Sequence, residues 1–352
     1  MTEMQELHVN NFGFFSEPVT AGEVEYSLLA QPTTTRHDVR SKGTLEQTPG
    51  TTLVPLCSME ERIMAIRRQC QKLGLSQTPK RVGFLTDPQH KVAYCEISKV
   101  GSTNMKRVLA TSTTKGKAMS PNRTRNWHST KLLRRVGLKY QHYDHMAATA
   151  NFTRFFIVRH PFDRLISAYN SKLGPLSRGN GGYAAISARI VKVSQRRSDK
   201  GQQQLQGNRT KPTVAEFIHA LVHRKISLTN NHWVPYAARY CHPCQVDYDH
   251  ILRLESMTHD SVPVMRRLGV SDDHAAQHRA KSVGVMRVKQ GTVSDGNRTF
   301  AVFKPLDVLS DVPQADLEKL YAMYRLDFEL YGYSFDVRTL QTGCLFNDVG
   351  CC

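Results

Sequence analysis

The sequence predicts an α/β fold, with a P-loop-like parallel sheet flanked by helices. Two stretches carry this prediction, because in each a short apolar run is followed by a loop and a helix. The first is "KVAYCEI" at 91–97, with a helix predicted from Met105. The second is "RFFIVR" at 154–159, which runs directly into "HPFDRLISAYNSKL". Strands that alternate with helices are typical of parallel sheets, and a continuous apolar run is typical of a strand buried on both faces.

The elements before these two units follow in chain order. Residues 1–55 lack periodicity and are rich in Thr, Gln, Gly and Pro, which predicts a flexible, disordered stem. Ser58 and Glu61 form a capping box that opens a helix, and Gly74 stands where its C-terminal cap is expected. The β-rich run "RVGFLT" at 81–86 predicts a further strand.

The elements after the first strand–helix unit are predicted in the same way. Pro161 favours the first turn of the helix that follows "RFFIVR". Residues 174–212 are rich in Gly, Ser and Gln and are basic, which indicates a loop insertion. Thr213 and Glu216 form a second capping box, and 315–333 reads as an amphipathic helix.

The domain organisation follows from length and composition. A chain of 352 residues is long enough for one large domain or two ordinary ones, and no internal repeat is visible. We interpret residues 56–345 as one domain that includes the basic insertion, and 346–352 as a tail.

The charge is strongly positive and unevenly distributed. Lys and Arg number 48 against 30 Asp and Glu, a formal net charge of +18. No acidic residue occurs between Ile97 and Tyr143, and Asp199 is the only one between Arg178 and Lys211. Such a field attracts polyanions: nucleic acid, anionic lipid or an acidic polysaccharide. Two solvated basic loops are the simpler alternative.

The cysteines and sequons bear on the compartment. Cys241 and Cys244 form a C-x-x-C without the second pair that a zinc ribbon needs. A redox or half-metal site is therefore less favoured than disulfides, either to other cysteines or between the two. Four N-glycosylation sequons, with eight cysteines in all, favour the lumen of the secretory pathway. The sequons begin at Asn122, Asn151, Asn208 and Asn297.

The sequence contains no recognisable membrane or signal segment. No stretch approaches the ~18 apolar residues of a membrane helix. The first residues, "MTEMQELHVNNFGFF", are polar and acidic where a signal peptide would be apolar. As written, the chain is expected to be soluble. A lumenal protein would then carry its targeting segment outside this sequence, or start elsewhere.

The loop after the first strand is a candidate anion site. A glycine allows close backbone approach, N–H groups that open a helix point at an anion, and the loop adds a lysine and two hydroxyls. It lacks the G-x-x-x-x-G-K-[ST] spacing of a nucleotide triphosphatase. A polar strand–helix turn is the alternative interpretation. The residues concerned are Ser98, Lys99, Val100, Gly101, Ser102, Thr103 and Asn104.

A second candidate anion site follows the second strand. Arg159 ends the apolar run, and Ser167 follows about two helical turns later. Such a pair suits a phosphate, with a charge-assisted fork from Arg and a hydroxyl from Ser. Alternatively, Arg159 pairs with a carboxylate and Ser167 lies on a helix surface. Two anion sites on two strands of one sheet suit a nucleoside that carries phosphates at both ends.

Five motifs in chain order resemble the Golgi carbohydrate sulfotransferases, which include chondroitin and dermatan 4-O-sulfotransferases and a glucuronyl sulfotransferase. The family's P-K-(V/A)-x-(C/S)-T-N-W-K-R reads here "SKVGSTNMKR", and its R-x-P-F-x-R-L-x-S-A-(Y/F)-x-x-K reads "RHPFDRLISAYNSK". Its H-W-x-P begins at His232, its C-x-P-C-x-(I/V)-x-Y-D is "CHPCQVDYD", and its closing motif is "YRLDFELYGY". The matches span roughly 92 to 333.

The resemblance implies a sulfotransferase-type fold and a Golgi enzyme, lumenal or membrane-anchored. It implies that 3′-phosphoadenosine-5′-phosphosulfate is the co-substrate, held by 98–104 at its 5′ end and by Arg159 and Ser167 at its 3′-phosphate. The acceptor implied is a glycan, most simply GalNAc of chondroitin or dermatan. Ser98 and Met105 depart from the family's proline and tryptophan, and neither change removes a ligand-contacting group. The family's membrane anchor is not seen, so any membrane contact would be through an anchor outside this chain.

Sulfuryl transfer needs a charge stabiliser and a base. Lys99 and the loop N–H groups are placed to neutralise the sulfate and the leaving phosphate. His232 is the first choice as general base, beside Trp233, on which a sugar face would stack. No metal is required, because the loop and Lys99 can neutralise the charge, and the sequence shows no paired carboxylates for Mg²⁺. The alternative bases are Glu255, His128, His142 and His145.

Other functions explain less of the sequence. A sulfotransferase that acts on a terminal sugar of a glycoprotein or glycolipid is the nearest alternative. A nucleic-acid-binding protein accounts for the charge of +18 but not for the two anion sites or the sequons, and no zinc-finger or RNP motif is present. A kinase-like enzyme would need a Walker loop or metal-binding carboxylates. The expected partner is therefore an acidic polysaccharide acceptor and not a nucleic acid.

Overall fold

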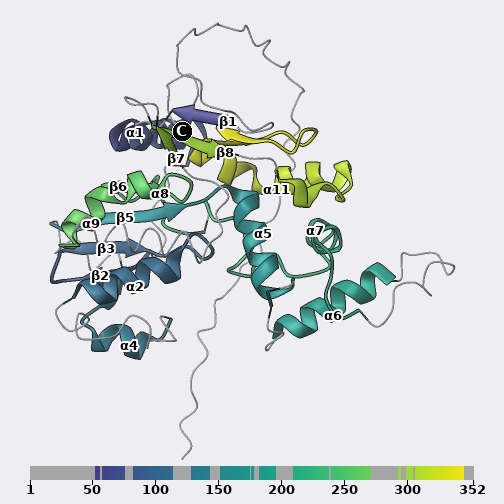
Figure 1. Ribbon diagram of the computed structural model, residues 1–352, viewed down its shortest axis with the longest axis horizontal. Coiled ribbons are helices and arrows are strands. Elements are labelled where there is room, and N and C mark those ends of the chain that lie inside the picture. Colours follow the sequence, from purple (N-terminus) through teal and green to yellow (C-terminus); the bar gives the residue numbers. More distant parts are fainter. Residues whose placement is uncertain are drawn as a thin grey trace, which may run out of the picture. The chain divides into compact units, whose positions relative to one another are not determined.

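The computed structural model describes twelve segments of the chain (Figure 1). They are residues 52–55, 58–75, 82–113, 128–142, 151–174, 176–177, 182–195, 209–237, 239–270, 292–294, 299–303 and 306–344. Most of the predicted stem and all of the predicted tail lie outside these segments. The last stem residues, Thr52–Pro55, form strand β1, which pairs with β8, Thr299–Phe303.

The central sheet has five strands in the order β4-β2-β3-β5-β6. Strands β3, β5 and β6 are parallel neighbours. The sequence predicts the first two of these strands, and β6 is an addition from the structure. Every residue of β3 is buried, as are the last four residues of β5. Both faces of these strands are therefore covered. The strands are β2 Gly83–Asp87, β3 Val92–Cys95, β4 Lys139–His142, β5 Thr153–Val158 and β6 His250–Arg253.

The prediction of a wholly parallel sheet is wrong for one half of it. β2 pairs antiparallel with both β3 and β4, so the sheet is mixed. Only four residues, 88–91, connect β2 to β3. A connection this short closes a hairpin, whereas a parallel crossover needs a dozen residues or more. The class is therefore α/β with a mixed sheet.

Three long helices begin where local signals place them. Ser58 and Glu61 make both bonds of their capping box at α1, Met59–Lys72, and Thr213 and Glu216 do so at α7, Val214–Val222. α5, Pro161–Lys172, has its proline in the first turn. α11, Gln314–Tyr331, matches the predicted amphipathic helix.

Two helices differ from the prediction. α2, Ser102–Ser112, begins three residues before Met105, because Gly101 (φ 89°) turns the chain and its carbonyl already accepts from the N–H of Met105. α6, Gly182–Gln195, lies within the predicted loop insertion and packs beside α7 (Figure 1). Its Ile190 and Val191 are buried, and such an apolar face stabilises a helix between polar flanks.

The shorter elements complete the described part of the chain. None of the described helices combines the length and apolarity needed to cross a bilayer. Two small antiparallel sheets have the orders β1-β8-β7 and β10-β9. The bounds are α4 Thr130–Arg135, α8 Met257–Asp260, α9 Val262–Arg267, β7 Thr292–Ser294, η4 Asp307–Leu309, β9 Tyr333–Phe335 and β10 Thr342–Cys344.

Two disulfides attach the C-x-x-C segment to the core. Cys241 bonds to Cys95 at the end of β3, and Cys244 bonds to Cys70 on α1. The prediction that Cys241 and Cys244 form disulfides is confirmed. Each of them bonds to a distant cysteine rather than to the other. The bonds close stretches of 146 and 174 residues, which restricts the unfolded chain.

Candidate functional site

The two predicted anion sites lie at the same edge of the sheet. β3 and β5 are parallel neighbours, with Cys95 opposite Phe156. The loop 96–101 leaves the carboxyl end of β3, and Arg159 directly follows β5. Ligands of open α/β sheets bind outside the carboxyl ends of the strands, so this edge is the candidate site.

The loop ends in an exposed helix N-terminus. Gly101 is the N-cap of α2 and provides no side-chain cap. The N–H groups of Asn104 and Met105 donate to the Gly101 carbonyl, at 2.9 and 3.1 Å. The N–H groups of Ser102 and Thr103 precede the first intrahelical bond, and such groups bind anions. Val100 is fully buried and belongs to the core, so its side chain anchors the loop.

Lys99 has an unusual backbone and a perturbed amine. Its φ is 74°, in a region that L-residues other than glycine rarely adopt, and such residues cluster at functional sites. Its Nζ donates to Oγ of Ser171 on α5, at 2.7 Å. Burial, and then the charges of Arg159, Lys172 and Arg164, lower the pKa of Lys99 to about 8. The charges that act most on this amine are all positive, which favours an anionic ligand.

Arg159 lies against the same loop. Its Nη1 donates to the Lys99 carbonyl at 3.4 Å, and its own carbonyl accepts from Tyr236. Its Nε is buried without a hydrogen-bond partner among the described residues. Ser167 is half-buried on α5, one turn before Ser171. The structure therefore brings Arg159 and Lys99 together, with Ser167 on the helix that also carries the partner of Lys99.

Arg164 connects this loop to the loop that carries His232. It is fully buried and donates to three backbone carbonyls, those of Ser98 (2.8 Å), Val234 (2.8 Å) and Asn231 (3.0 Å). This role of Arg164 is not among the sequence-based predictions. The available signal was the arginine within "RHPFDRL", whose position on a buried helix face is visible in the helical spacing.

His232 is held as a neutral imidazole beside the cations. The backbone N–H of His232 donates to Oδ1 of Asn230 at 3.0 Å. Burial, and then the positive charges led by Lys172 and Lys99, lower the pKa of His232 to about 4. Its Nδ1 is buried and has no partner among the described residues. A neutral imidazole can accept a proton, so the arrangement is compatible with a base.

Trp233 cannot serve as the expected sugar platform. Its side chain is only 1% exposed, its Nε1 donates to the Ser227 carbonyl, and its ring packs edge-on against Phe217. The accessible ring beside His232 is that of Tyr183 on α6, with centroids 5.9 Å apart. The prediction of stacking on Trp233 is therefore wrong, because the indole is part of the core.

Among the alternative bases, His128 lies closest to the loop. It contacts Oγ1 of Thr103 at 3.1 Å and Nζ of Lys106 at 3.2 Å, and burial followed by Lys106 lowers its pKa. Glu255 is buried and accepts from the His160 N–H and the Tyr333 hydroxyl, which makes it a structural acceptor.

The two remaining alternative bases are His142 and His145, and the structure does not bring either of them to the Lys99 loop among the described residues. His142 is exposed at the end of β4, and two strands separate that residue from Arg159. His145 lies outside the described residues. His232 and His128 are therefore the histidines that the structure brings near the loop.

Comparison with known proteins agrees with this geometry. A model of the Sulfotransferase family matches residues 82–334. Carbohydrate sulfotransferase 12 of Mus musculus is 29% identical over 279 residues, covering 71% of this chain and 59% of that protein. Carbohydrate sulfotransferase 8 of Mus musculus is 25% identical over 288 residues, covering 79% and 64%. Carbohydrate sulfotransferase 10 of Homo sapiens is 27% identical over 314 residues, covering 83% and 80%.

The chain spans 59% and 64% of the length of the first two of these relatives. No solved structure matches the chain significantly. The family match covers more than half of the sequence and includes the Lys99 loop, Arg159 and His232. The chain therefore belongs to the sulfotransferase family, and it is similar to the carbohydrate sulfotransferases within it.

Proposed function

We propose that the protein transfers a sulfuryl group from 3′-phosphoadenosine-5′-phosphosulfate to a hydroxyl group of a glycan. One observation carries the proposal: Lys99, Arg159 and the N-terminus of α2 meet at the carboxyl ends of β3 and β5. The charges that act most on the Lys99 amine are those of Arg159, Lys172 and Arg164, and such a cluster of like charges suits a ligand with two anionic ends.

The donor would bind with its two ends on the two strands. The 5′-phosphosulfate lies over the N–H groups of Ser102 and Thr103, with Lys99 beside it. The 3′-phosphate takes the guanidinium of Arg159 and the hydroxyl of Ser167. Ser171 holds the Lys99 amine 2.7 Å away until the donor replaces it as partner.

The transfer step balances without a metal. The acceptor oxygen forms a bond to sulfur while the bond from sulfur to the 5′-phosphate oxygen breaks, and the hydroxyl proton passes to the neutral imidazole of His232. Lys99 and the α2 N–H groups neutralise the charge that develops on the leaving phosphate. The bisphosphorylated nucleoside then leaves.

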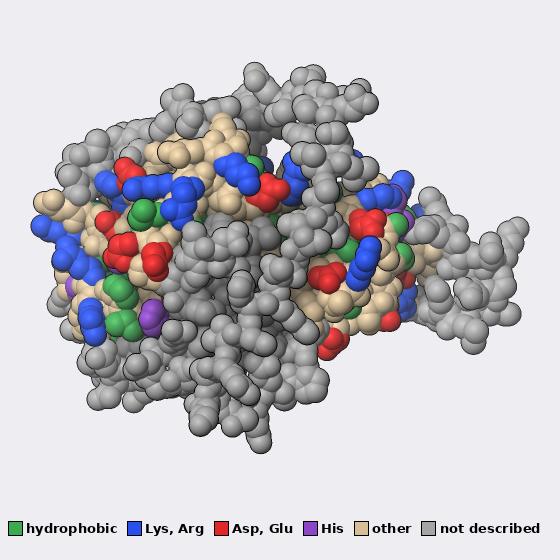
Figure 2. Space-filling model, turned by 90° about the horizontal axis from the view of Figure 1, so that it is seen from above, with side chains coloured by type: hydrophobic (Ala, Val, Ile, Leu, Met, Phe, Trp, Pro, Cys, Tyr) green, Lys and Arg blue, Asp and Glu red, His purple; other side chains and the backbone are tan. Residues whose placement is uncertain are grey.

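An acidic glycan is the proposed acceptor, most simply GalNAc of chondroitin or dermatan. The net charge of +18 supports it, and so does the position of α4. His128, at the start of that segment, contacts Thr103, and Arg134 and Arg135 are exposed at the helix end. Figure 2 shows Lys and Arg side chains interspersed with acidic ones on the described part of one face. A terminal sugar of a glycoprotein or glycolipid is the second candidate.

We also propose a Golgi location, lumenal or through a membrane anchor outside this chain. The two disulfides support it, because such bonds persist in oxidising compartments. A nucleic acid is not expected as a partner, since Lys99 and Arg159 lie at the carboxyl ends of two parallel strands, where α/β sheets bind small ligands.

The direct test is transfer of radiolabelled sulfate from the donor. The acceptors are desulfated chondroitin, desulfated dermatan, a neutral terminal disaccharide and single-stranded DNA as an anionic non-substrate. Incorporation into the first two, mapped to GalNAc by disaccharide analysis, is expected. Incorporation into the neutral disaccharide alone would favour the second candidate acceptor, a terminal sugar of a glycoprotein or glycolipid. No incorporation into any sugar would refute the proposed sulfotransferase activity.

Two double variants test whether the basic residues of α4 bind the acceptor. Arg134→Gln with Arg135→Gln removes two exposed charges from the last turn of α4, and Arg266→Gln with Arg267→Gln does the same in the last turn of α9. Only the first variant should weaken use of the polymer and flatten its salt dependence. Equal behaviour of both pairs would mean that the basic residues of α4 are solvated and do not touch the acceptor.

Arg159 should determine the preference for a 3′-phosphate. Arg159→Ala is expected to weaken binding of adenosine 3′,5′-bisphosphate by ~1.5–3 kcal/mol, about ten- to a hundredfold, and to leave adenosine 5′-phosphate unaffected. Calorimetric titration measures both. Arg154→Ala, at the opposite end of the same strand, is the control and should change neither. An unchanged preference in Arg159→Ala would place the 3′-phosphate elsewhere.

Donor affinity should decrease above about pH 8. The pKa of Lys99 is about 8, so the amine loses its charge as the pH rises through that value, and a bound anion favours the charged form. The binding constant should be flat from pH 7 to 8 and then fall by up to about tenfold per pH unit, with proton uptake on binding. Lys99→Arg, which stays charged, should flatten the slope. A slope that persists in Lys99→Arg would assign the titration to another group.

A further inference from the structure

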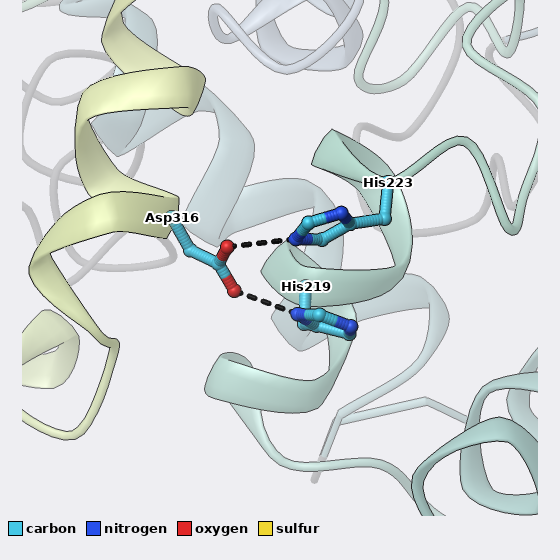
Figure 3. A group of neighbouring side chains, drawn as sticks. All are labelled: His219, His223 and Asp316. Atoms are coloured by element: carbon cyan, nitrogen blue, oxygen red, sulfur yellow. Dashed lines mark hydrogen bonds and ion pairs between the residues drawn. The ribbon is translucent and has the colours of Figure 1, made fainter. Parts of the chain in front are cut away.

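Two histidines and an aspartate meet between α7 and α11, apart from the residues assigned to sulfuryl transfer (Figure 3). His219 Nδ1 lies 2.7 Å from Asp316 Oδ2, and His223 Nε2 lies 2.9 Å from Asp316 Oδ1. The potential ligand atoms of the three side chains all lie within 4.8 Å of one another. Each carboxylate oxygen therefore faces a different imidazole.

We propose that His219, His223 and Asp316 bind a divalent transition-metal ion of the zinc class. Two histidines four residues apart on one helix face are a recurrent pair of zinc ligands, and a carboxylate oxygen completes a donor set that zinc accepts. At bond lengths of about 2.0–2.1 Å, tetrahedral ligand atoms lie about 3.3 Å apart. The observed N–O separations of 2.7 and 2.9 Å run to the two different oxygens of Asp316 and would open by about half an ångström. Ligand atoms that now lie up to 4.8 Å apart would draw together to about 3.3 Å, which side-chain rotation can supply.

The surroundings favour a cation and leave room for a further ligand. Asp316 is largely buried, while His219 and Asp316 line an open pocket of about 190 Å³. Ser194, Glu216 and Asp311 also line this pocket. The Glu216 carboxylate is paired with Arg209, so Asp311 is the further carboxyl group here that adds to the negative charge of Asp316. A water in the pocket would supply the fourth ligand.

The proposed ligands come from two helices, α7 and α11. The capping box of Thr213 and Glu216 begins α7, and the residues that bind would come from its middle and its end. Asp316 lies in the first turn of α11, and its N–H donates to the Pro313 carbonyl. His219 lies within α7 and His223 is the C-cap of that helix, so the ion would join the end of α7 to the start of α11.

The ion would be structural and not part of the transfer step. Residues two apart on a helix lie about 200° apart, so His219 projects on the side of α7 away from Phe217. Phe217 packs against Trp233, the neighbour of His232. The proposed site therefore lies on the face of α7 opposite to Phe217, and it would stabilise the helix against which Trp233 packs. This inference is independent of donor binding.

The alternative is a pair of ordinary hydrogen bonds that clamp the two helices. The chain offers a matched control for it, because His90 Nδ1 lies 2.6 Å from Asp87 Oδ2 in the β2–β3 turn. This pair has one histidine and one carboxylate, which is too few protein ligands for a zinc site. His90→Ala therefore removes a similar hydrogen bond without removing a proposed ligand.

The experiment is metal binding by the oxidised full chain, without a histidine tag and after chelator treatment. One equivalent of Zn²⁺ should bind, measured by elemental analysis and calorimetry. Co²⁺ should give the intense visible bands of a tetrahedral site without a thiolate charge-transfer band. His223→Ala should weaken Zn²⁺ binding by at least about tenfold, and His90→Ala should leave it unchanged. Zn²⁺ at about 100 times its Kd should raise the Tm of the unmodified chain by a few degrees and that of His223→Ala by much less.

Each contrary result overturns the inference. Absence of stoichiometric Zn²⁺ and of cobalt bands in the unmodified chain would leave a hydrogen-bonded clamp. Equal affinity in His223→Ala and in the unmodified chain would place the metal elsewhere. If His223→Ala fails to fold, Asp316→Asn, which keeps the side-chain shape, replaces it and should show the same weakening. The X-ray absorption spectrum of the Zn²⁺ complex must also show two imidazoles, and a spectrum without them would contradict the proposed site.

Discussion

Lys99→Ala should reduce kcat by about a hundred- to a thousandfold while the fold stays intact. The amine is a preorganised positive charge that would act on the leaving phosphate, and loss of one such donor typically costs this factor. Its partner in the absence of the donor is a serine hydroxyl rather than a carboxylate, so no buried charge is left unpaired by the substitution. Turnover at saturating donor, together with Tm and circular dichroism, measures the effect.

Lys91→Ala is the matched control for this variant. Lys91 is also a lysine with positive φ, 54°, but it lies in the exposed turn between β2 and β3. Both substitutions place alanine in the left-handed region, so both carry the same kind of backbone cost. Lys91→Ala should keep normal turnover. If Lys99→Ala also turns over normally, the loop is not the phosphosulfate site.

Arg164→Met should destabilise the protein and also impair transfer in the molecules that remain folded. The substitution leaves three carbonyls without their donor, those of Ser98, Asn231 and Val234. An unsatisfied buried carbonyl costs about 1–3 kcal/mol, and these three bonds are part-buried, so the loss is about 2 kcal/mol or more. The same bonds hold the Lys99 loop to the His232 loop. A misplacement of about 1 Å between the two would lower kcat/KM by about a hundredfold.

Substitution of a second buried arginine, Arg253, separates the loss of stability from the loss of transfer activity. Arg253 is equally buried and lies over the ring of Tyr333 at 4.8 Å, much as Arg164 lies over Tyr236 at 5.0 Å. Arg253 ends β6 and donates to the Tyr331 carbonyl, one strand further along the sheet from Arg159. Arg253→Met should lose stability to a similar degree and keep kcat/KM per folded molecule. An unchanged kcat/KM per folded molecule in Arg164→Met would show that Arg164 contributes stability alone.

Local signals in the sequence determined much of the fold. The capping boxes at Ser58 and Thr213, and Pro161 at the start of α5, act within one helical turn, and each helix begins where they place it. The apolar run at 154–159 predicts the buried strand β5 because burial on both faces requires apolar side chains at consecutive positions. The loop 98–104 and Arg159 are predicted as anion sites from local patterns of the same kind, and the donor-binding experiments test that prediction.

Only the tertiary structure decided which distant residues meet. The sequence does not contain the pairing of Cys95 with Cys241, the three carbonyls of Arg164 or the burial of Trp233, because each depends on segments far apart in the chain. α6 was missed because its polar flanks resemble a loop, and its stability comes from packing on α7. His219 and Asp316 are 97 residues apart and meet only because α7 packs on α11. Contacts of this kind are set by which apolar faces can be buried together, a property of the whole chain that no short stretch encodes.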